Sequence, residues 1–364
     1  MTMKSYPIVP GIIQLKSNVE YIPTFQLGEV LEPKLERDNC LVKVKFKVSD
    51  RIDVLTQNLT HIAGSLYKLN GENAVYRVHQ LIRFKCLDKI KLQILLRNLE
   101  TNPELIVNKL YYRFLRFPIH DWLTPGHHLM NVIHAKLLLN GMGFAHCASI
   151  FDDTHGGIML FGSPNVGKTL TAFLSVIEHG FKMISEDITL IDRKGYIYSC
   201  PYTLTYFRNK LVINELFKRR YLSNKDIIKT NVLNFMERIS IISSFAPRPP
   251  RVSKIITALP FKDRAPVKSI IFLARTKSTI KEIKTLDEGE AMKLASFFNR
   301  VEFDYYRDPL ILAYSLYSPE YHPDKLLNLS EILLKSLIRK VEQILLIKAS
   351  SPVEYAKLIK DLIS

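Results

Sequence analysis

The sequence predicts an α/β fold in which a mixed β-sheet carries a glycine-rich loop, with a separate α+β domain before it. The loop, Gly162 to Thr169, lies between a short apolar run and a segment with helical spacing of apolar residues. A second apolar run, Pro266 to Ala274, is typical of a buried strand. With 364 residues, of which 47% are hydrophobic, the chain is long enough for more than one domain with a substantial core.

The pattern of the chain changes near residue 135, and this change predicts the domain boundaries. We expect an N-terminal α+β domain over residues 1–135, whose role the sequence does not indicate. Residues 136–285 are predicted to form the core around the glycine-rich loop. Beyond Asp287 helical patterns prevail, so we expect residues 286–364 to form a helical section packed on that core.

Three elements are predicted in the N-terminal part. The alternation of apolar and basic residues from Cys40 to Val48 indicates a half-buried strand. From about Leu92 to Leu115 apolar residues recur at helical spacing, with a break at Asn102-Pro103. Met130 to Asn140 is predicted to be a helix that ends near Gly141.

The core is predicted to alternate strands and helices. The following list gives the elements: strand Phe144–Phe151, turn 152–156, strand 157–161, helix Leu170–Glu178 with Gly180 after it, strand Phe181–Ile191, strand Tyr196–Ser199, a helix-rich stretch 205–240, a basic loop 246–251, and strand Pro266–Ala274. A strand, a glycine-rich loop and a helix in this order predict a P-loop core.

The composition excludes several classes of protein. The cysteines Cys40, Cys86, Cys147 and Cys200 are scattered without a CxxC pair, so we expect reduced thiols rather than disulfides or a zinc site. No long uninterrupted apolar stretch occurs, and residues 1–11 lack the layout of a secretion signal. We therefore expect no membrane span and a cytoplasmic location.

The net charge of +16 is unevenly distributed. Residues 205–255 carry eleven Lys and Arg against three Asp and Glu. Such a segment forms either a solvated basic face or a docking surface for an anionic partner such as RNA. A second copy of the chain is a further candidate partner.

The loop itself fits the phosphate-binding pattern G-x-x-x-x-G-K-[ST] at every position. Glycines at both ends let consecutive backbone N–H groups turn inward around phosphates. Lys168 would contact the β- and γ-phosphates of ATP, and the Thr169 hydroxyl would bind Mg²⁺. The predicted nucleotide-binding residues are Gly162, Ser163, Pro164, Asn165, Val166, Gly167, Lys168, Thr169 and Leu170.

Two carboxylates and a histidine are the other candidate site residues. Glu186 and Asp187 lie on the strand predicted to follow the loop's helix directly. One of them would hold Mg²⁺ and the other could accept a proton from an attacking hydroxyl. Since neighbouring strand residues point to opposite faces, both reach one site only near a strand end or a bulge. His146, on a strand expected next to that of the loop, is either a core histidine or a site residue.

From Phe144 to Ile191 the chain resembles the kinase domain of the HPr kinase/phosphorylase group, whose architecture is related to that of ATP-dependent phosphoenolpyruvate carboxykinase. The resemblance rests on His146-Cys-Ala-Ser149, on the phosphate loop, and on Gly180-Phe-Lys-Met-Ile-Ser-Glu-Asp-Ile-Thr-Leu-Ile191. Weaker similarity follows in Cys200-Pro-Tyr202 and in residues 265–275. It covers roughly 130 residues with gaps, and it implies a mixed sheet of the HPr kinase/PEP carboxykinase type.

The resemblance implies a kinase that transfers the γ-phosphate of ATP to a hydroxyl, typically a serine of a protein or peptide. By position it makes His146 the active-site histidine, Asp187 the acid near the metal, and Glu186 the catalytic base. The family usually has Asp where this chain has Glu186, which moves the carboxylate by one methylene. The family's glycine-rich signature after the acidic pair is missing, so HPr is not the expected acceptor.

Two further functions fit the same residues. One is a kinase or ATPase that acts on nucleic acid through the basic segment 205–255, and the other is an ATP-binding regulator with little turnover. Phosphoryl transfer also needs a cation near the γ-phosphate, for which Arg248, Arg251 and Arg275 are candidates, each equally suited to a surface role.

Overall fold

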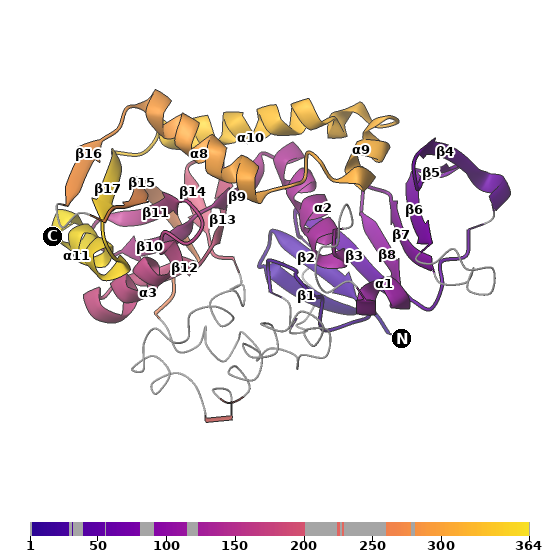
Figure 1. Ribbon diagram of the computed structural model, residues 1–364, viewed down its shortest axis with the longest axis horizontal. Helices are drawn as coiled ribbons and strands as arrows, with labels where there is room; N and C mark the ends of the chain where they lie inside the picture. The colour runs from indigo at the N-terminus through magenta and orange to yellow at the C-terminus, as the bar shows by residue number, and fades with distance from the viewer. Residues whose placement is uncertain are drawn as a thin grey trace. The chain divides into compact units, whose positions relative to one another are not determined.

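The structure is a computed structural model in which the described residues form two compact units (Figure 1). The first unit contains those of Met1–Asn140, Lys225–Pro250 and Asp304–Leu327, and the second contains those of Gly141–Asn224, Arg251–Phe303 and Asn328–Ser364. Each unit combines helices with a mixed sheet, as an α/β protein does. The structure describes residues 2–28, 31, 39–54, 56–80, 91–114, 123–200, 224–225, 228, 260–277 and 281–363.

The described residues of the first unit form an eight-stranded sheet in the order β1-β2-β3-β8-β7-β6-β5-β4. Its strands are β1 (Lys4–Val9), β2 (Ile13–Ser17), β3 (Val42–Ser49), β4 (Leu59–Ala63), β5 (Leu66–Leu69), β6 (Ala74–Gln80), β7 (Lys91–Arg97) and β8 (Glu104–Asn108). In β3 the valines and Phe46 are buried while Lys45 and Lys47 are exposed. This alternation confirms the strand predicted for Cys40–Val48.

Several helices accompany this sheet in the described part of the first unit. These are α1 (Lys109–Phe114), α2 (Pro125–Leu139), α9 (Pro309–Ser315), and the short 3-10 helices η1 (Thr56–Asn58) and η3 (Pro319–Tyr321). The helix predicted for Met130–Asn140 is confirmed, although it begins earlier, at Pro125, because Thr124 caps its first turn. Buried Asp308 joins α9 to α2 by accepting hydrogen bonds from His128 Nδ1 at 2.8 Å and Asn131 Nδ2 at 2.9 Å.

The helical pattern predicted from Leu92 to Leu115 is wrong for most of its length. Residues 91–97 and 104–108 are the antiparallel strands β7 and β8, and the helix α1 begins only at Lys109. In β7 the residues from Leu92 to Leu96 are all buried. A short run that is apolar on both faces has no distinguishing period, so sheet pairing overrides the helix propensity of leucine.

The described residues of the second unit form a nine-stranded sheet in which β12-β10-β11-β15-β14-β13-β9 make one path and β16 and β17 extend it from β15. Its strands are β9 (Met142–His146), β10 (Ala148–Asp152), β11 (Gly156–Gly162), β12 (Lys182–Ser185), β13 (Ile188–Asp192), β14 (Tyr196–Tyr198), β15 (Arg264–Arg275), β16 (Glu282–Thr285) and β17 (Gln343–Ala349). Long β15 pairs in parallel with both β11 and β17.

Helices cover both faces of this sheet: α3 (Lys168–His179), α8 (Glu288–Glu302), α11 (Pro352–Ile363) and the part of α10 (Pro323–Ile338) from Asn328 onward. Alternate residues of β15 show the layering. Ile271 and Leu273 belong to the core beneath α3 and α11, whereas Phe272 stacks on Phe161 and lies near Phe298 of α8. Figure 1 shows α3 and α11 on one side of the strands and α8 on the other.

Two predicted strands of the core are each divided in the structure. Phe144–Phe151 is interrupted at Cys147 and Phe181–Ile191 at Glu186-Asp187. The helix after the loop, its cap at Gly180 with φ 79°, and the strands within 157–161, 196–199 and 266–274 are confirmed. The C-terminal section, predicted to be helical, also contains β17 inside the sheet.

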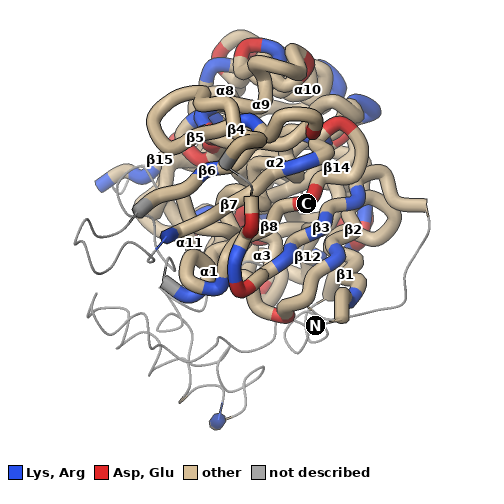
Figure 2. The backbone as a smooth tube through the Cα atoms, turned by 90° about the vertical axis from the view of Figure 1, so that its right-hand side faces the viewer, with Lys and Arg blue, Asp and Glu red and all other residues tan. Residues whose placement is uncertain are grey.

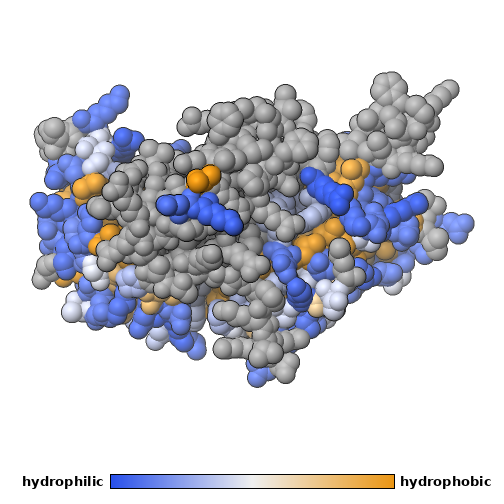
Figure 3. Space-filling view, turned by 90° about the horizontal axis from the view of Figure 1, so that it is seen from below, coloured by the Kyte–Doolittle hydropathy of each residue, from blue (hydrophilic) through white to orange (hydrophobic). Residues whose placement is uncertain are grey.

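Over the described residues the surface in Figure 3 is mostly hydrophilic, with small hydrophobic patches. No helix among them has the length and apolar character needed to cross a membrane. The helix-rich stretch 205–240 and the basic loop 246–251 that the sequence predicts lie outside the described residues, apart from residues 224, 225 and 228.

Candidate functional site

The glycine-rich loop connects the end of β11 to the start of α3. Gly167, at the N-cap of α3, has φ 107°, a left-handed conformation that residues with a side chain rarely adopt. A Cβ on Gly167 would come within 2.6 Å of Pro352 Cγ, and one on Gly162 within 2.8 Å of the carbonyl oxygen of Leu273. The loop therefore requires glycine at both ends, while Ser163, Pro164 and Asn165 between them are exposed.

Lys168 is folded back across this loop. Its side chain is buried, and its ammonium donates hydrogen bonds to the carbonyl oxygen of Gly162 at 2.9 Å and to His146 Nε2 at 3.0 Å. The positive charge thus lies at the N-terminal end of α3, where the helix dipole also favours an anion. Lys168 and His146, which the sequence places on separate elements, meet in the structure.

His146 lies next to the acidic pair because two places where the chain passes from one strand to the next lie side by side in the sheet. After β9 the chain crosses at Cys147 to β10, and after β12 it crosses at Glu186-Asp187 to β13. His146 is paired with Ile188, and Ser149 with Ser185, so the crossings are neighbours. His146 Nδ1 lies 3.9 Å from Asp187 Oδ1 as a result.

The imidazole of His146 is held in its neutral form. Burial is the main cause and lowers its pKa to about 4; the Asp187 carboxylate opposes this shift, and the Lys168 ammonium acts in the same direction as burial. Since Lys168 donates to Nε2, this nitrogen carries the lone pair and the ring proton lies on Nδ1. Nδ1 is therefore the polar atom that His146 presents toward Asp187.

The two acidic residues differ in environment. Glu186 is only 2% exposed, whereas the Asp187 side chain is 22% exposed. Both lie in the break between β12 and β13, where the Asp187 carboxylate lies beside His146 and the Glu186 side chain is buried. The Thr169 hydroxyl is 3.5 Å from the backbone carbonyl oxygen of Glu186, which places the expected metal ligand of the loop next to the pair.

Glu302, at the end of α8, is a site residue that sequence reasoning missed. Its Oε2 lies 3.8 Å from His146 Nδ1, and the ligand atoms of His146, Asp187 and Glu302 all lie within 4.8 Å of one another. His146 Nδ1 is buried and has no hydrogen-bond partner among the described residues. The group could hold a divalent cation; its carboxylates and the Thr169 hydroxyl suit Mg²⁺, which prefers oxygen, better than the imidazole does.

Asn299, one turn before Glu302, fixes α8 to the strand that carries His146. Its Oδ1 accepts a hydrogen bond from the backbone N–H of His146 at 2.9 Å, and its Nδ2 donates to the carbonyl oxygen of Phe144 at 3.2 Å. Asn299 is 5% exposed. This contact sets the position of Glu302 relative to His146.

Burial makes Cys147 and Cys200 poorly reactive. Burial raises the pKa of Cys147 to about 12 and that of Cys200 to about 12, so both thiols stay protonated at neutral pH. Cys40, Cys147 and Cys200 are free thiols, as the sequence predicted for them.

Of the three candidate arginines, only Arg275 lies in the described part of the chain. It is the last residue of β15, whose residue Leu273 is paired with Gly162 at the start of the loop. Arg275 is exposed at the same edge of the sheet. Arg248 and Arg251, and with them most of the basic segment 205–255, lie outside the described residues.

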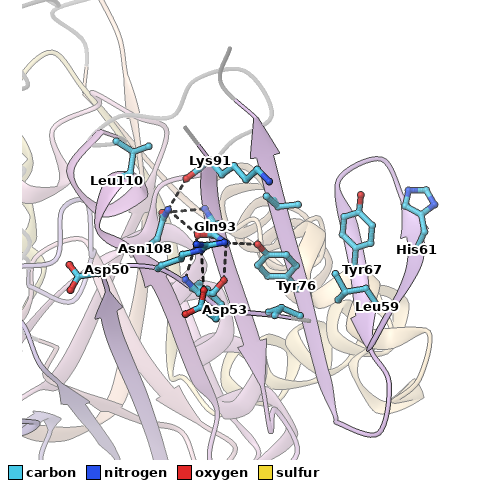
Figure 4. A pocket seen from close by; sticks show the side chains of 14 residues that line it. Asp50, Asp53, Leu59, His61, Tyr67, Tyr76, Lys91, Gln93, Asn108 and Leu110 are labelled. Atoms are coloured by element: carbon cyan, nitrogen blue, oxygen red, sulfur yellow. Dashed lines mark hydrogen bonds and ion pairs between the residues drawn. The ribbon is translucent and has the colours of Figure 1, made fainter. Parts of the chain in front are cut away.

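A separate cavity of about 950 Å³ in the first unit holds none of the predicted site residues (Figure 4). Gln93 Nε2 donates to the carbonyl oxygen of Ile52 and to Tyr76 Oη, and Asn108 Nδ2 donates to Lys91 O and Gln93 Oε1. The amide donors of both residues are thus used inside the protein. This network connects neighbouring strands of the sheet beneath the cavity, whose lining also contains charged residues such as Asp50, Asp53 and Lys91.

Comparisons with known proteins add no further assignment. No protein-family model matches the sequence, and a search of curated proteins finds no match.

Proposed function

We propose that the chain is an ATP-dependent kinase that transfers the γ-phosphate to a hydroxyl on a protein, peptide or small molecule. The observation that carries the proposal is the continuity of contacts from Lys168 Nζ to His146 Nε2 and from His146 Nδ1 to Asp187. These contacts connect the glycine-rich loop at the N-terminus of α3 to carboxylates at one edge of the sheet. Phosphoryl transfer requires a phosphate cradle and acidic groups in such proximity.

The loop and α3 supply the phosphate-binding half. Backbone N–H groups of residues 162–170 and the N-terminal end of α3 would bind the phosphates. Lys168 would exchange its contacts with Gly162 and His146 for the β- and γ-phosphates. Thr169 and Asp187 would hold Mg²⁺, with Glu302 as a further ligand; when bound, the ion neutralises charge on the phosphates.

Glu186 would be the proton acceptor. In the proposed step the acceptor oxygen forms a bond to the γ-phosphorus, the bond from that phosphorus to the β–γ bridging oxygen breaks, ADP leaves, and the hydroxyl proton passes to Glu186. Because Glu186 is almost fully buried, its carboxylate would have to become accessible to the acceptor hydroxyl when the substrates bind. By the resemblance to the HPr kinase group, a serine hydroxyl is the first acceptor class to test.

The test uses purified chain, Mg²⁺ and γ-labelled ATP with a lysate divided into protein, RNA and small-molecule fractions. We expect label in a hydroxyl-bearing fraction, a loss of about 100-fold or more in Lys168→Ala, and loss of transfer with retained ATP affinity in Glu186→Gln. Full transfer by Glu186→Gln would remove it as the base. Absence of ATP binding by the unmodified chain would overturn the proposal.

One alternative has a specific observation in its favour. Glu186 stands where the family usually has Asp and is almost fully buried, which also suits an ATP-binding regulator with little turnover. Tight ATP binding without consumption in any fraction would favour that function. Label in the RNA fraction would instead favour the nucleic-acid kinase that the +16 charge suggests.

A further inference from the structure

Helices α8 and α10 of the second unit enclose a groove on the side of α8 that faces away from the sheet. Two ion pairs bridge the helices at its ends, Arg300 with Glu331 and Arg339 with Glu288, the latter at 3.4 Å. Because the partners follow in opposite order along the chain, the helices run antiparallel. The groove between the ion pairs has a volume of about 890 Å³.

Large apolar side chains in this groove are exposed. Phe297 of α8 is 59% exposed and Ile332 of α10 is 44% exposed, while half-buried Met292 and buried Ile338 also line the groove. The opposite stripe of α8, with Ala291, Ala295 and Asn299, is buried toward the sheet. An apolar surface of this kind, bordered by charges, is typical of a binding site for a partner.

The charges that remain available at the groove are positive. Arg300 and Arg339 are engaged by Glu331 and Glu288, whereas Lys293 and Lys335 are exposed and form no ion pair with any carboxylate in the described part of the chain. Figure 2 shows basic and acidic residues interspersed over these helices. Two exposed lysines on either side of an apolar floor complement a ligand that is apolar on one face and acidic at its flanks.

We propose that the α8–α10 groove binds an amphipathic helix of a partner protein, with its apolar face on Phe297 and Ile332 and its acidic side chains paired with Lys293 and Lys335. On α8 the two ion pairs are separated by the length from Glu288 to Arg300, about 18 Å, which matches a helix of about three turns. A helix lying in an apolar groove is a common mode of peptide recognition. This proposal stands independently of the kinase activity.

The charge pattern argues against a second copy of this chain in the groove. Self-association would bring Lys293 and Lys335 of two chains together, and each chain carries a net charge of +16. An acidic partner removes that repulsion. The partner would also stabilise α8, whose other side carries Asn299 and Glu302. Binding in the groove would therefore affect the candidate site through α8.

The test measures binding of two fluorescent helical peptides to the full chain by anisotropy. Both peptides span roughly four helical turns and carry leucines at helical spacing on one face; one has Glu and the other Lys on the flanks. We expect the Glu peptide to bind at least about 10-fold more tightly, Phe297→Ala to weaken it about 30-fold, and the double variant Lys293→Glu, Lys335→Glu to prefer the Lys peptide. Val353→Ala, at a residue 57% exposed on α11, is the matched control and should leave binding unchanged.

Four results would overturn the proposal. Equal binding of both peptides, or binding unaffected by Phe297→Ala, would show that the groove is not the site. A dimer in light scattering that dissociates in Phe297→Ala would assign the groove to a second copy. Binding to phosphatidylserine vesicles that requires Phe297, with no peptide binding, would assign it to a membrane surface.

Discussion

At the scale of single residues, Gly167 is a position of the loop where both the backbone conformation and a close neighbour require glycine. An alanine there would adopt φ 107° and place its Cβ 2.6 Å from Pro352 Cγ. We expect Gly167→Ala to abolish nucleotide binding and to lower the free energy of unfolding by more than the roughly 1 kcal/mol that a left-handed alanine costs. Urea denaturation and a nucleotide titration measure the two effects.

Gly180→Ala is the control for this prediction. Gly180 has φ 79° at the other end of α3, and no atom of the described residues lies within 4 Å of the position of its Cβ. The substitution therefore carries the same backbone cost, about 1 kcal/mol, without the contact. If both variants lose equal stability and bind nucleotide equally well, the close approach of Pro352 does not shape the loop.

His146 should make the stability of the protein depend on pH. Burial lowers its pKa from 6.5 to about 4 in the folded state, so the unfolded chain takes up this proton first as the pH falls. The contribution is complete above pH 6.5 and is lost as the pH falls toward 4, by about 3 kcal/mol at most. We expect the free energy of unfolding of His146→Gln, measured with urea, to depend less on pH in this window than that of the unmodified chain. The surface substitution His322→Gln should leave this pH dependence unchanged.

A second buried histidine provides an internal comparison. Burial lowers the pKa of His134, in the first unit, to about 3. The free energy of unfolding therefore also falls with falling pH because of His134. His146→Gln should therefore remove only part of the acid sensitivity. Identical pH profiles for the unmodified chain and His146→Gln would contradict the neutral, buried state assigned to His146.

The sequence could indicate the residues of the loop but not those supplied by α8. The loop residues are contiguous, and their spacing follows from how a backbone encloses phosphates. Glu302 and Asn299 lie on a much later segment of the chain, with no motif around them. One weak signal existed: a carboxylate in the last turn of a helix opposes the helix dipole, so Glu302 needs a compensating partner.

At the scale of elements, the sequence predicted strands by their apolar runs but not their interruptions. Phe144–Phe151 is a largely apolar run in which nothing local marks the crossing at Cys147, whereas in Phe181–Ile191 the acidic pair Glu186-Asp187 indicates a strand end or a bulge without showing which of the two it is. These crossings arise because the two halves of each run pair with different neighbours in the sheet. Pairing of this kind is set by tertiary structure, which a local pattern does not contain.

Asn299 connects α8 to β9 through two hydrogen bonds. Asn299→Ala would leave the buried N–H of His146 and the carbonyl oxygen of Phe144 without these hydrogen bonds. We expect a loss of about 1–3 kcal/mol in the free energy of unfolding, and faster amide exchange in α8. Asn328→Ala, at an exposed asparagine of α10, should change neither.

Asn299→Asp separates the two hydrogen bonds. The aspartate oxygen can still accept from the His146 N–H but cannot donate to Phe144 as the amide does. We expect stability below that of Asn299→Ala at neutral pH, because the buried carboxylate loses its hydration and one of its oxygens faces the Phe144 carbonyl oxygen. If Asn299→Ala unfolds at the same urea concentration as the unmodified chain, another contact of α8 holds it on β9.

At the scale of the whole molecule, each unit has its own sheet and its own hydrophobic core. The second unit's core lies between the sheet and helices α3 and α11, directly beneath the loop, and includes Val166, Phe173 and Tyr355. A smaller cluster in the first unit, around Tyr76 and Ile106, serves a different sheet. A ligand at Gly162–Thr169 therefore acts on the second unit first.

This separation predicts where nucleotide slows hydrogen exchange. Loop amides that bind phosphate would be protected from exchange, and a bound nucleotide would also stabilise α3 and the β12–β13 crossing, which Thr169 links to the loop. With saturating ATP and Mg²⁺ we expect slower exchange over residues 162–192, with the strands β1–β8 unchanged. Lys168→Ala should remove this protection. In the absence of nucleotide, exchange in the first unit of this variant should equal that of the unmodified chain. Equal protection of both units would show that nucleotide binding couples them, and unchanged exchange in the loop would place the nucleotide elsewhere.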